Sequence, residues 1–211
     1  MPATWDIEDY GDFSLTLSRN HSPEQVLAAY GAEPGEARLM SESQCDTEIE
    51  VTETGALLRT GKLGSWSFCM ESTNPIGFAN LILKNLSDGS EAFSLGRTGY
   101  SMTVFKYAQY GQFCEWFEPR NHQTVQGGSP HAFFQRIQNM PSDTSAAMAS
   151  LKVMSEHVGA ELTPEILKGA LLTVNITNAD RALLARPVPS FQITSPAGTR
   201  SVLGRRLGRI G

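Results

Sequence analysis

Glu118, His122 and His131 are the residues of this sequence whose types and spacing come closest to an acid–base site. Glu118 and His122 stand on either side of Pro119, and His131 follows a polar loop that contains two adjacent glycines. A carboxylate and an imidazole that meet in this way can act as a general acid and base. One hypothesis is therefore a small hydrolase or transferase with its site near these three residues. The alternative interpretation of His122 is a loop histidine exposed to water.

No motif with a known catalytic spacing accompanies these residues. The four histidines occur in no HExxH frame, no serine occupies a GxSxG frame, and the three cysteines form no CxxC pair. Glu48, Glu50 and Glu53 form a short row of carboxylates, but they alternate with Ile49 and Val51 as on the solvent face of a strand. We therefore expect no metal site and no cofactor.

Aromatic residues crowd the stretch from Tyr100 to Phe117, and they suggest a binding surface instead. Aromatic side chains dominate both protein cores and binding hot spots. Tyr110 falls at the tip of an expected hairpin, where it should be exposed, and Arg97 or Arg120 beside it would complete an anchor. The principal hypothesis is a non-catalytic protein of the regulatory or immunity kind that binds another protein, with Arg97, Tyr110 and Trp116 as candidate binding residues. A homo-oligomer remains a further option.

The charges are unevenly distributed along the chain. The net charge of −5 gives no general attraction to nucleic acid or to anionic lipid. The acids concentrate between Asp6 and Glu53, whereas the residues beyond Asp180 include six arginines and no acid. A second alternative is therefore binding to nucleic acid or to a membrane surface through this basic tail, with Arg205 and Arg206 as contacts.

The elements that must position these residues are visible as periodic patterns. Strict alternation predicts strands at Phe13–Arg19 and 65–71, and further strands are expected at 38–40, 49–51, 56–59, 91–95, 101–107 and 112–118. Capping signals predict helices at 22–30, with Ser22 and Gln25 as a capping box, and at 75–86, with Asn74 as cap and Pro75 in the first turn. A short helix is expected at 130–137, a longer one after Ser142 that ends at Gly159, and another after Thr163.

These elements predict an α+β fold with a mostly antiparallel sheet covered by two helices and a C-terminal helical subdomain. We expect a core domain at 1–125, the helical subdomain at 126–180 and a tail rich in proline, glycine and arginine at 181–211. The opening residues show no secretory signal, and no apolar run reaches the length of a transmembrane helix, so a cytoplasmic protein is expected.

Several segments also resemble a known family in their order and spacing. They are Phe13–Arg19 followed by Ser22–Leu27, then Gly64–Phe68, Leu86–Ala92, Phe105–Gly111, Trp116–Pro119 and Leu162–Leu167. Together they resemble an uncharacterised family of small cytosolic proteins, mostly from actinomycetes, over about residues 5 to 170. Since that family has no assigned activity, the resemblance implies no function and no site residues.

Overall fold

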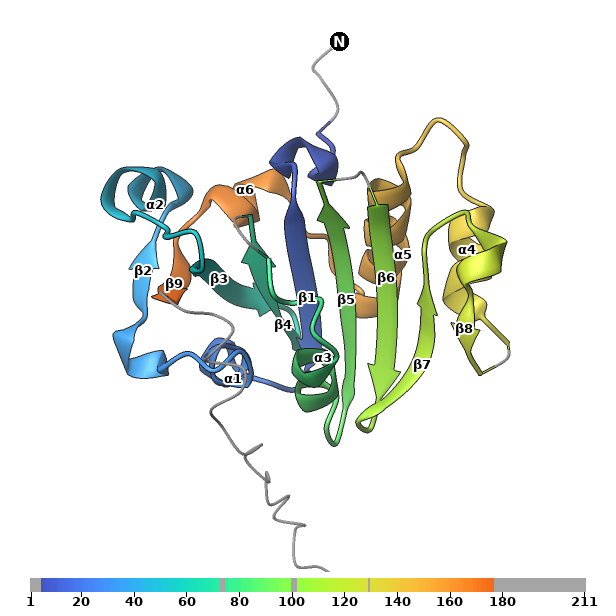
Figure 1. Ribbon diagram of the computed structural model, residues 1–211, viewed down its shortest axis with the longest axis horizontal. Helices are drawn as coiled ribbons and strands as arrows, with labels where there is room; N and C mark the ends of the chain where they lie inside the picture. Colours follow the sequence, from blue (N-terminus) through green and yellow to red (C-terminus); the bar gives the residue numbers. More distant parts are fainter. Residues whose placement is uncertain (1–4, 73–74, 100–101, 129, 177–211) are drawn as a thin grey trace, which may run out of the picture.

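The structure is a computed structural model that describes residues 5–72, 75–99, 102–128 and 130–176, and these residues form one antiparallel sheet with helices on both faces (Figure 1). The strands lie in the order β2-β9-β3-β4-β1-β5-β6-β7-β8. Their bounds are β1 Phe13–Arg19, β2 Arg38–Met40, β3 Ala56–Leu63, β4 Trp66–Glu71, β5 Glu91–Thr98, β6 Met102–Gln109, β7 Gln112–Phe117, β8 Gln126–Gly127 and β9 Leu171–Ile176. The α+β class and the antiparallel sheet predicted from the sequence are confirmed.

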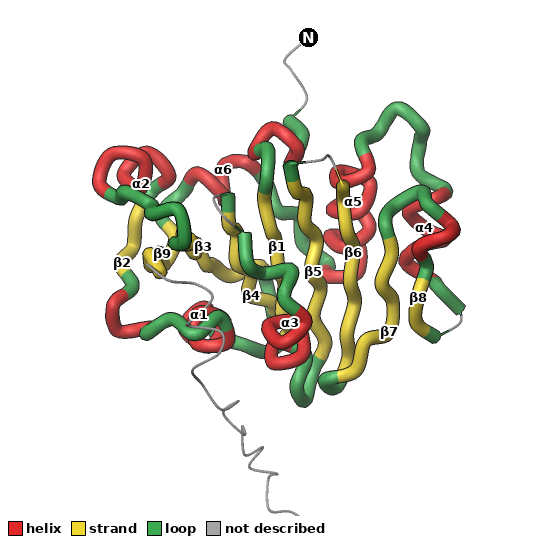
Figure 2. Tube along the Cα trace, viewed as in Figure 1, coloured by secondary structure: helices red, strands yellow, loops and turns green. Residues whose placement is uncertain are grey.

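The helices form two layers around this sheet. The α-helices within the described ranges are α1 Pro23–Ala29, α2 Glu42–Glu48, α3 Asn80–Leu86, α4 Ala132–Gln138, α5 Ala146–Val158 and α6 Pro164–Lys168. Short 3-10 helices are η1 Ile7–Tyr10, η2 Pro34–Glu36 and η3 His122–Thr124. In the view of Figure 2, α1 and α3 lie in front of the sheet and α5 lies behind it.

One face of the sheet carries most of the large apolar side chains. Phe13, Leu15 and Leu17 of β1 alternate onto this face, and β4 and β5 add Trp66, Phe68, Met70, Phe93 and Leu95. Helices α4, α5 and α6 and η1 cover it, and their buried residues join the same hydrophobic cluster. This face therefore supplies the larger core of the fold.

The opposite face of the central strands carries small and polar residues. Ser14, Thr16 and Ser18 alternate with the apolar residues of β1, and all three are fully buried. Helices α1 and α3 cover them through Val26, Leu27, Ile82, Leu83 and Leu86. As a result, the second core contains buried polar groups that need hydrogen-bond partners.

Local signals account for the elements that match the sequence predictions. Strand β1 has the predicted bounds, and α1 begins after Ser22, whose hydroxyl accepts from the N–H of Gln25 while the Gln25 side chain accepts from the N–H of Ser22. Gly159 closes α5 in the left-handed conformation, and the Thr163 hydroxyl caps α6.

Two predicted elements were wrong in position or type. Helix α3 begins at Asn80 and not at residue 75: the N–H groups of Ile76 and Gly77 donate to the Glu71 carboxylate, and the chain forms a turn between Ile76 and Ala79 before the helix. Asn74, the predicted cap, lies outside the described residues. The strand expected at 49–51 is absent from the described structure, and α2 precedes this segment with a capping box formed by Ser41 and Gln44.

The sequence predicted two helices that cover the sheet and a C-terminal helical subdomain packed on the core domain. Helices α1 and α3 cover one face of the sheet. Helices α4, α5 and α6 lie on the far face of the same sheet and share one hydrophobic cluster with β1, β4 and β5. The chain then returns to the sheet as β9, which pairs with β2 on one side and β3 on the other. No helix among the described residues is long and apolar enough to cross a membrane.

Candidate functional site

Glu118, His122 and His131 do not form a joint site in the structure. The Glu118 carboxylate accepts a hydrogen bond from the Asn121 side chain at 3.1 Å, while the exposed ring of His122 packs edge-on against Phe134 with 5.0 Å between ring centroids. His131 is the N-cap residue of α4. In the described ranges no hydrogen bond or ion pair joins any two of these three side chains, and no group of three or more His, Cys, Asp or Glu residues could hold a metal ion.

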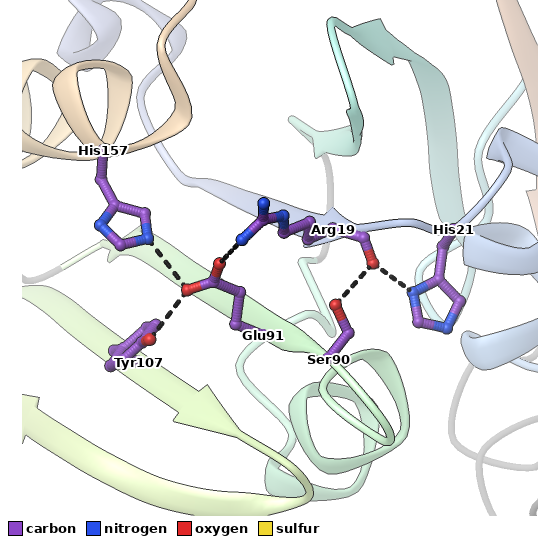
Figure 3. Close-up of polar contacts among 6 residues, drawn as sticks. All are labelled: Arg19, His21, Ser90, Glu91, Tyr107 and His157. Atoms are coloured by element: carbon purple, nitrogen blue, oxygen red, sulfur yellow. Dashed lines mark hydrogen bonds and ion pairs between the residues drawn. The ribbon is translucent and has the colours of Figure 1, made fainter.

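The main convergence of titratable side chains lies instead around Glu91, at the start of β5 (Figure 3). One carboxylate oxygen accepts from Arg19 Nη1 of β1 at 2.8 Å. The other accepts from the Tyr107 hydroxyl of β6 and from His157 Nε2 of α5, each at 2.9 Å. The Glu91 side chain is only 8 % exposed, so these three donors replace most of its contact with water.

The Glu91 cluster acts as a structural tie between α5 and the sheet. Burial by itself would raise the pKa of Glu91, but the hydrogen bonds from Arg19, His157 and Tyr107 outweigh it and lower the pKa below the ordinary range. Burial and the nearby Glu91 carboxylate raise the pKa of Tyr107 well above its usual value. The His157 ring also packs against Trp66, Phe93 and Phe133. An ionised carboxylate with three donors and an aromatic surround is well suited to hold α5 in place.

A second buried carboxyl, Glu71 at the end of β4, lies on the opposite face of the sheet. Its two oxygens accept from the N–H groups of Ile76 and Gly77 at 2.7 and 3.0 Å. Burial raises the pKa of Glu71 to about 7, although the amide donors act in the opposite direction. Gly77 is required at this contact, because a Cβ atom there would lie 2.5 Å from Glu71 Oε1 and 2.6 Å from the Tyr30 hydroxyl. The carboxyl is fully buried, so it holds the segment before α3 and presents nothing to a ligand.

The three binding residues predicted in the described ranges lie in two different places. Arg97 donates to the backbone oxygen of Glu8 at 3.2 Å and forms an ion pair with the Glu8 carboxylate at 3.6 Å. Because Arg97 pairs with Thr103 at the far end of β6, roughly 20 Å of strand separates it from Tyr110. Arg120 donates to three backbone oxygens between Pro141 and Thr144, so it holds the loop before α5. Arg205 and Arg206 lie outside the described residues.

Trp116 belongs to a surface of β6 and β7 that we call the open face, which is formed by the exposed residues Met102, Phe113 and Trp116 around the buried Lys106, and Tyr110 lies in the turn that joins the two strands. Lys106 pairs with Trp116 and Ala108 pairs with Phe113, so these side chains project to one side. Trp116, Phe113 and Met102 are 40 %, 41 % and 44 % exposed, and Tyr110 in the turn is 68 % exposed. In Figure 1 no helix lies in front of β6 and β7 on this side.

A β-bulge explains why two large aromatics share this face. The register shifts after Tyr107, so that Tyr107 pairs with Glu115 while the next residue, Ala108, pairs with Phe113. Cys114 is the additional residue, and it allows Phe113 and Trp116 to point to the same side although they are three apart. Without the bulge, an odd separation would place them on opposite faces. The alternation rule applied to the sequence therefore missed Phe113.

The open face contains a small pocket with a lysine at its wall. Lys106, Phe113 and Trp116 line it together with Asn80 of α3 and Gln126 of β8, and its volume is about 240 Å³. Lys106 is 7 % exposed and donates from Nζ to the Phe78 backbone oxygen at 2.7 Å and to Asn80 Oδ1 at 2.9 Å. Its ammonium group lies 5.3 Å from the centre of the Trp116 ring. Burial lowers the pKa of Lys106.

Comparison with known protein families identifies one that this chain matches. Residues 5–180 match a family of unknown function, DUF6461. The chain belongs to this family. Neither the curated proteins nor the solved structures contain one that matches it.

The DUF6461 region contains the whole of the described sheet, since β9 ends at Ile176. The open face and both buried carboxyl clusters therefore lie inside it. Arg205 and Arg206 lie beyond its last matched residue.

Proposed function

We propose that this DUF6461 protein is a non-catalytic protein of the regulatory or immunity kind, and that it binds another protein through the open face. The observation that carries the proposal is the group of Trp116, Phe113 and Tyr110, which are all at least 40 % exposed at one end of a sheet that helices cover elsewhere. Exposed aromatics that sit together on a rigid surface are the usual centre of a protein interface.

The rigidity of the support favours the same function. The ring of Phe117, which is fully buried behind the open face, stacks on Phe105 at 4.8 Å between centroids. Glu115 accepts from the N–H groups of Phe133 and Phe134, both at 3.1 Å, and so fixes β7 to α4. Aromatic side chains held on such a strand lose little conformational freedom when a partner binds.

Capture of a partner by matched variants tests the proposal. Trp116→Ala should weaken capture of the partner bound by the unaltered protein by about thirtyfold or more, as expected for truncation of a hot-spot aromatic worth at least about 2 kcal/mol. Leu39→Ala is the control, because Leu39 is 71 % exposed on β2 at the opposite edge of the sheet. It should leave capture unchanged.

A photo-crosslinking amino acid at position 110 supplies a direct readout of the contact surface. It should form a covalent adduct with the same partner, identified by mass spectrometry. Equal capture by Trp116→Ala and Leu39→Ala, with no adduct from position 110, would refute a role for the open face.

A further inference from the structure

Lys106 is an unusual residue to find in the wall of an exposed aromatic surface. Its side chain is almost completely buried, and the ammonium group has three N–H donors, of which two have protein acceptors in Phe78 and Asn80. For the third N–H the described residues supply no hydrogen-bond acceptor. A desolvated cation with one free donor is a strong attraction for an anion that can enter the pocket.

The charges around the pocket favour a negatively charged group. Lys106 is the basic residue among those that line the pocket. Lys106 forms no ion pair within the described residues. Glu115 borders the pocket, but its carboxylate reaches the N-terminus of α4 on the other side of the sheet. The pocket therefore offers an anion one buried ammonium group that has no ion-pair partner within the described residues.

The shape of the pocket limits what the anion can be attached to. Phe113 and Trp116 form its apolar walls, and Asn80 and Gln126 stand at the rim. A volume of about 240 Å³ admits one side chain or a chain end, and excludes a large ligand such as a nucleotide. A carboxylate accepts hydrogen bonds from both Lys106 and a side-chain amide, and an adjoining apolar group can lie on the indole ring.

We propose that the Lys106 pocket binds a carboxylate of the protein partner, from an aspartate, a glutamate or a chain terminus, next to an aromatic or aliphatic side chain that packs on Trp116. This inference rests on the proposed function and specifies the chemistry of the partner. The apolar side chain of the partner buries the exposed surface of Trp116. The ion pair with Lys106 favours apolar segments that also carry a carboxylate over those that do not.

A pair of small probes tests carboxylate recognition on the unaltered protein. 3-Phenylpropionate and 3-phenylpropionamide have nearly the same shape, but only the first carries a charge. Each is titrated into the full-length protein and followed by two-dimensional NMR at the Trp116 indole N–H and the Lys106 backbone N–H. The carboxylate should bind with a millimolar Kd, as expected for a ligand of this size, and at least tenfold more tightly than the amide.

The variant Lys106→Met assigns the preference to the lysine. It should bind the two probes with equal affinity while the indole signal still shifts. If the variant fails to fold, the comparison of the two probes on the unaltered protein still decides the question. Equal affinities for acid and amide, or no shift at Trp116 with either probe, would overturn carboxylate recognition.

Peptides displayed on phage separate this inference from the proposed function. Selection on the unaltered protein, with Trp116→Ala used to remove unrelated binders, should enrich peptides that carry an acid beside an apolar residue. Peptides that need Trp116 but show no enrichment of acids would overturn the carboxylate and leave protein binding in place. Peptides that bind the unaltered protein and Trp116→Ala equally would refute a role for the open face in protein binding.

Discussion

Replacement of Glu71 by glutamine should change how the stability of this protein depends on pH. Burial raises the pKa of Glu71 from an ordinary 4.5 to about 7. Between these two values the folded protein keeps a proton on Glu71 that the unfolded chain has lost. The contribution of this group to the free energy of unfolding is therefore complete below pH 4.5 and is lost as the pH rises through 7.

The size of the effect follows from the two pKa values. A difference between 4.5 and about 7 corresponds to about 3 kcal/mol of unfolding free energy across this pH range. Burial also lowers the pKa of His21, which gives a dependence of the opposite sign near neutral pH. The quantity to compare is thus the difference between the unaltered protein and Glu71→Gln at each pH, because His21 contributes equally to both.

Urea unfolding at a series of pH values, followed by the fluorescence of the buried Trp66, measures this difference. The glutamine retains only one acceptor for the N–H groups of Ile76 and Gly77, so the variant should be less stable at low pH. The free energy of unfolding of the variant, relative to that of the unaltered protein, should then rise by about 3 kcal/mol as the pH rises from 4.5 to above 7.

Glu115→Gln is the matched control, since Glu115 is also a buried carboxylate that accepts from two backbone N–H groups. This variant should lose stability through its missing hydrogen bond and keep the dependence on pH that Glu71 produces. Parallel stability curves for the unaltered protein and Glu71→Gln would refute the raised pKa.

Two further substitutions test the packing that surrounds the open face and the Glu91 cluster. Gly96→Ala would place a Cβ against the Phe78 ring with no room between them, so it should cost about 1–3 kcal/mol in thermal unfolding, whereas Gly128→Ala, with nothing within 4 Å, should be neutral. Tyr107→Phe removes one of the three donors to Glu91 and should cost about 1–2 kcal/mol in urea unfolding; an unchanged midpoint would show that this hydrogen bond contributes no net stability.

The elements that could be predicted from the sequence are those that depend on neighbouring residues. Strand β1 shows its alternation within seven residues, and the capping box of α1 lies within four. Helix α3 could not be placed in this way, because the segment before it packs on the sheet through contacts with distant residues, such as the hydrogen bonds from Ser94 to the Gly77 oxygen and from Lys106 to the Phe78 oxygen. The predicted helix was therefore too long by about one and a half turns at its N-terminal end.

The candidate site was only partly predictable for the same reason. The hairpin pattern indicated an exposed Tyr110, and the aromatic composition indicated Trp116. Phe113 and Lys106 were missed, because the first depends on a bulge in the pairing of β6 with β7 and the second on its distance from Phe78 and Asn80. Strand β9 was missed as well, since its partners β2 and β3 precede it by more than a hundred residues.

The buried carboxyl and the open face belong to one arrangement of the chain. Glu71 accepts from the N–H groups of Ile76 and Gly77, and the segment between Ile76 and Ala79 forms a turn that lies over β5 and β6 before α3 begins at Asn80. The Phe78 ring lies against Gly96, and a side chain at position 96 would leave no room for this ring. The backbone oxygen of Phe78 accepts from Lys106. A helix from residue 75, as the sequence predicted, would use that oxygen within its own turns and remove one of the two hydrogen-bond acceptors of the Lys106 ammonium. The late start of α3 is therefore what allows a lysine to stay buried in the wall of an exposed aromatic pocket.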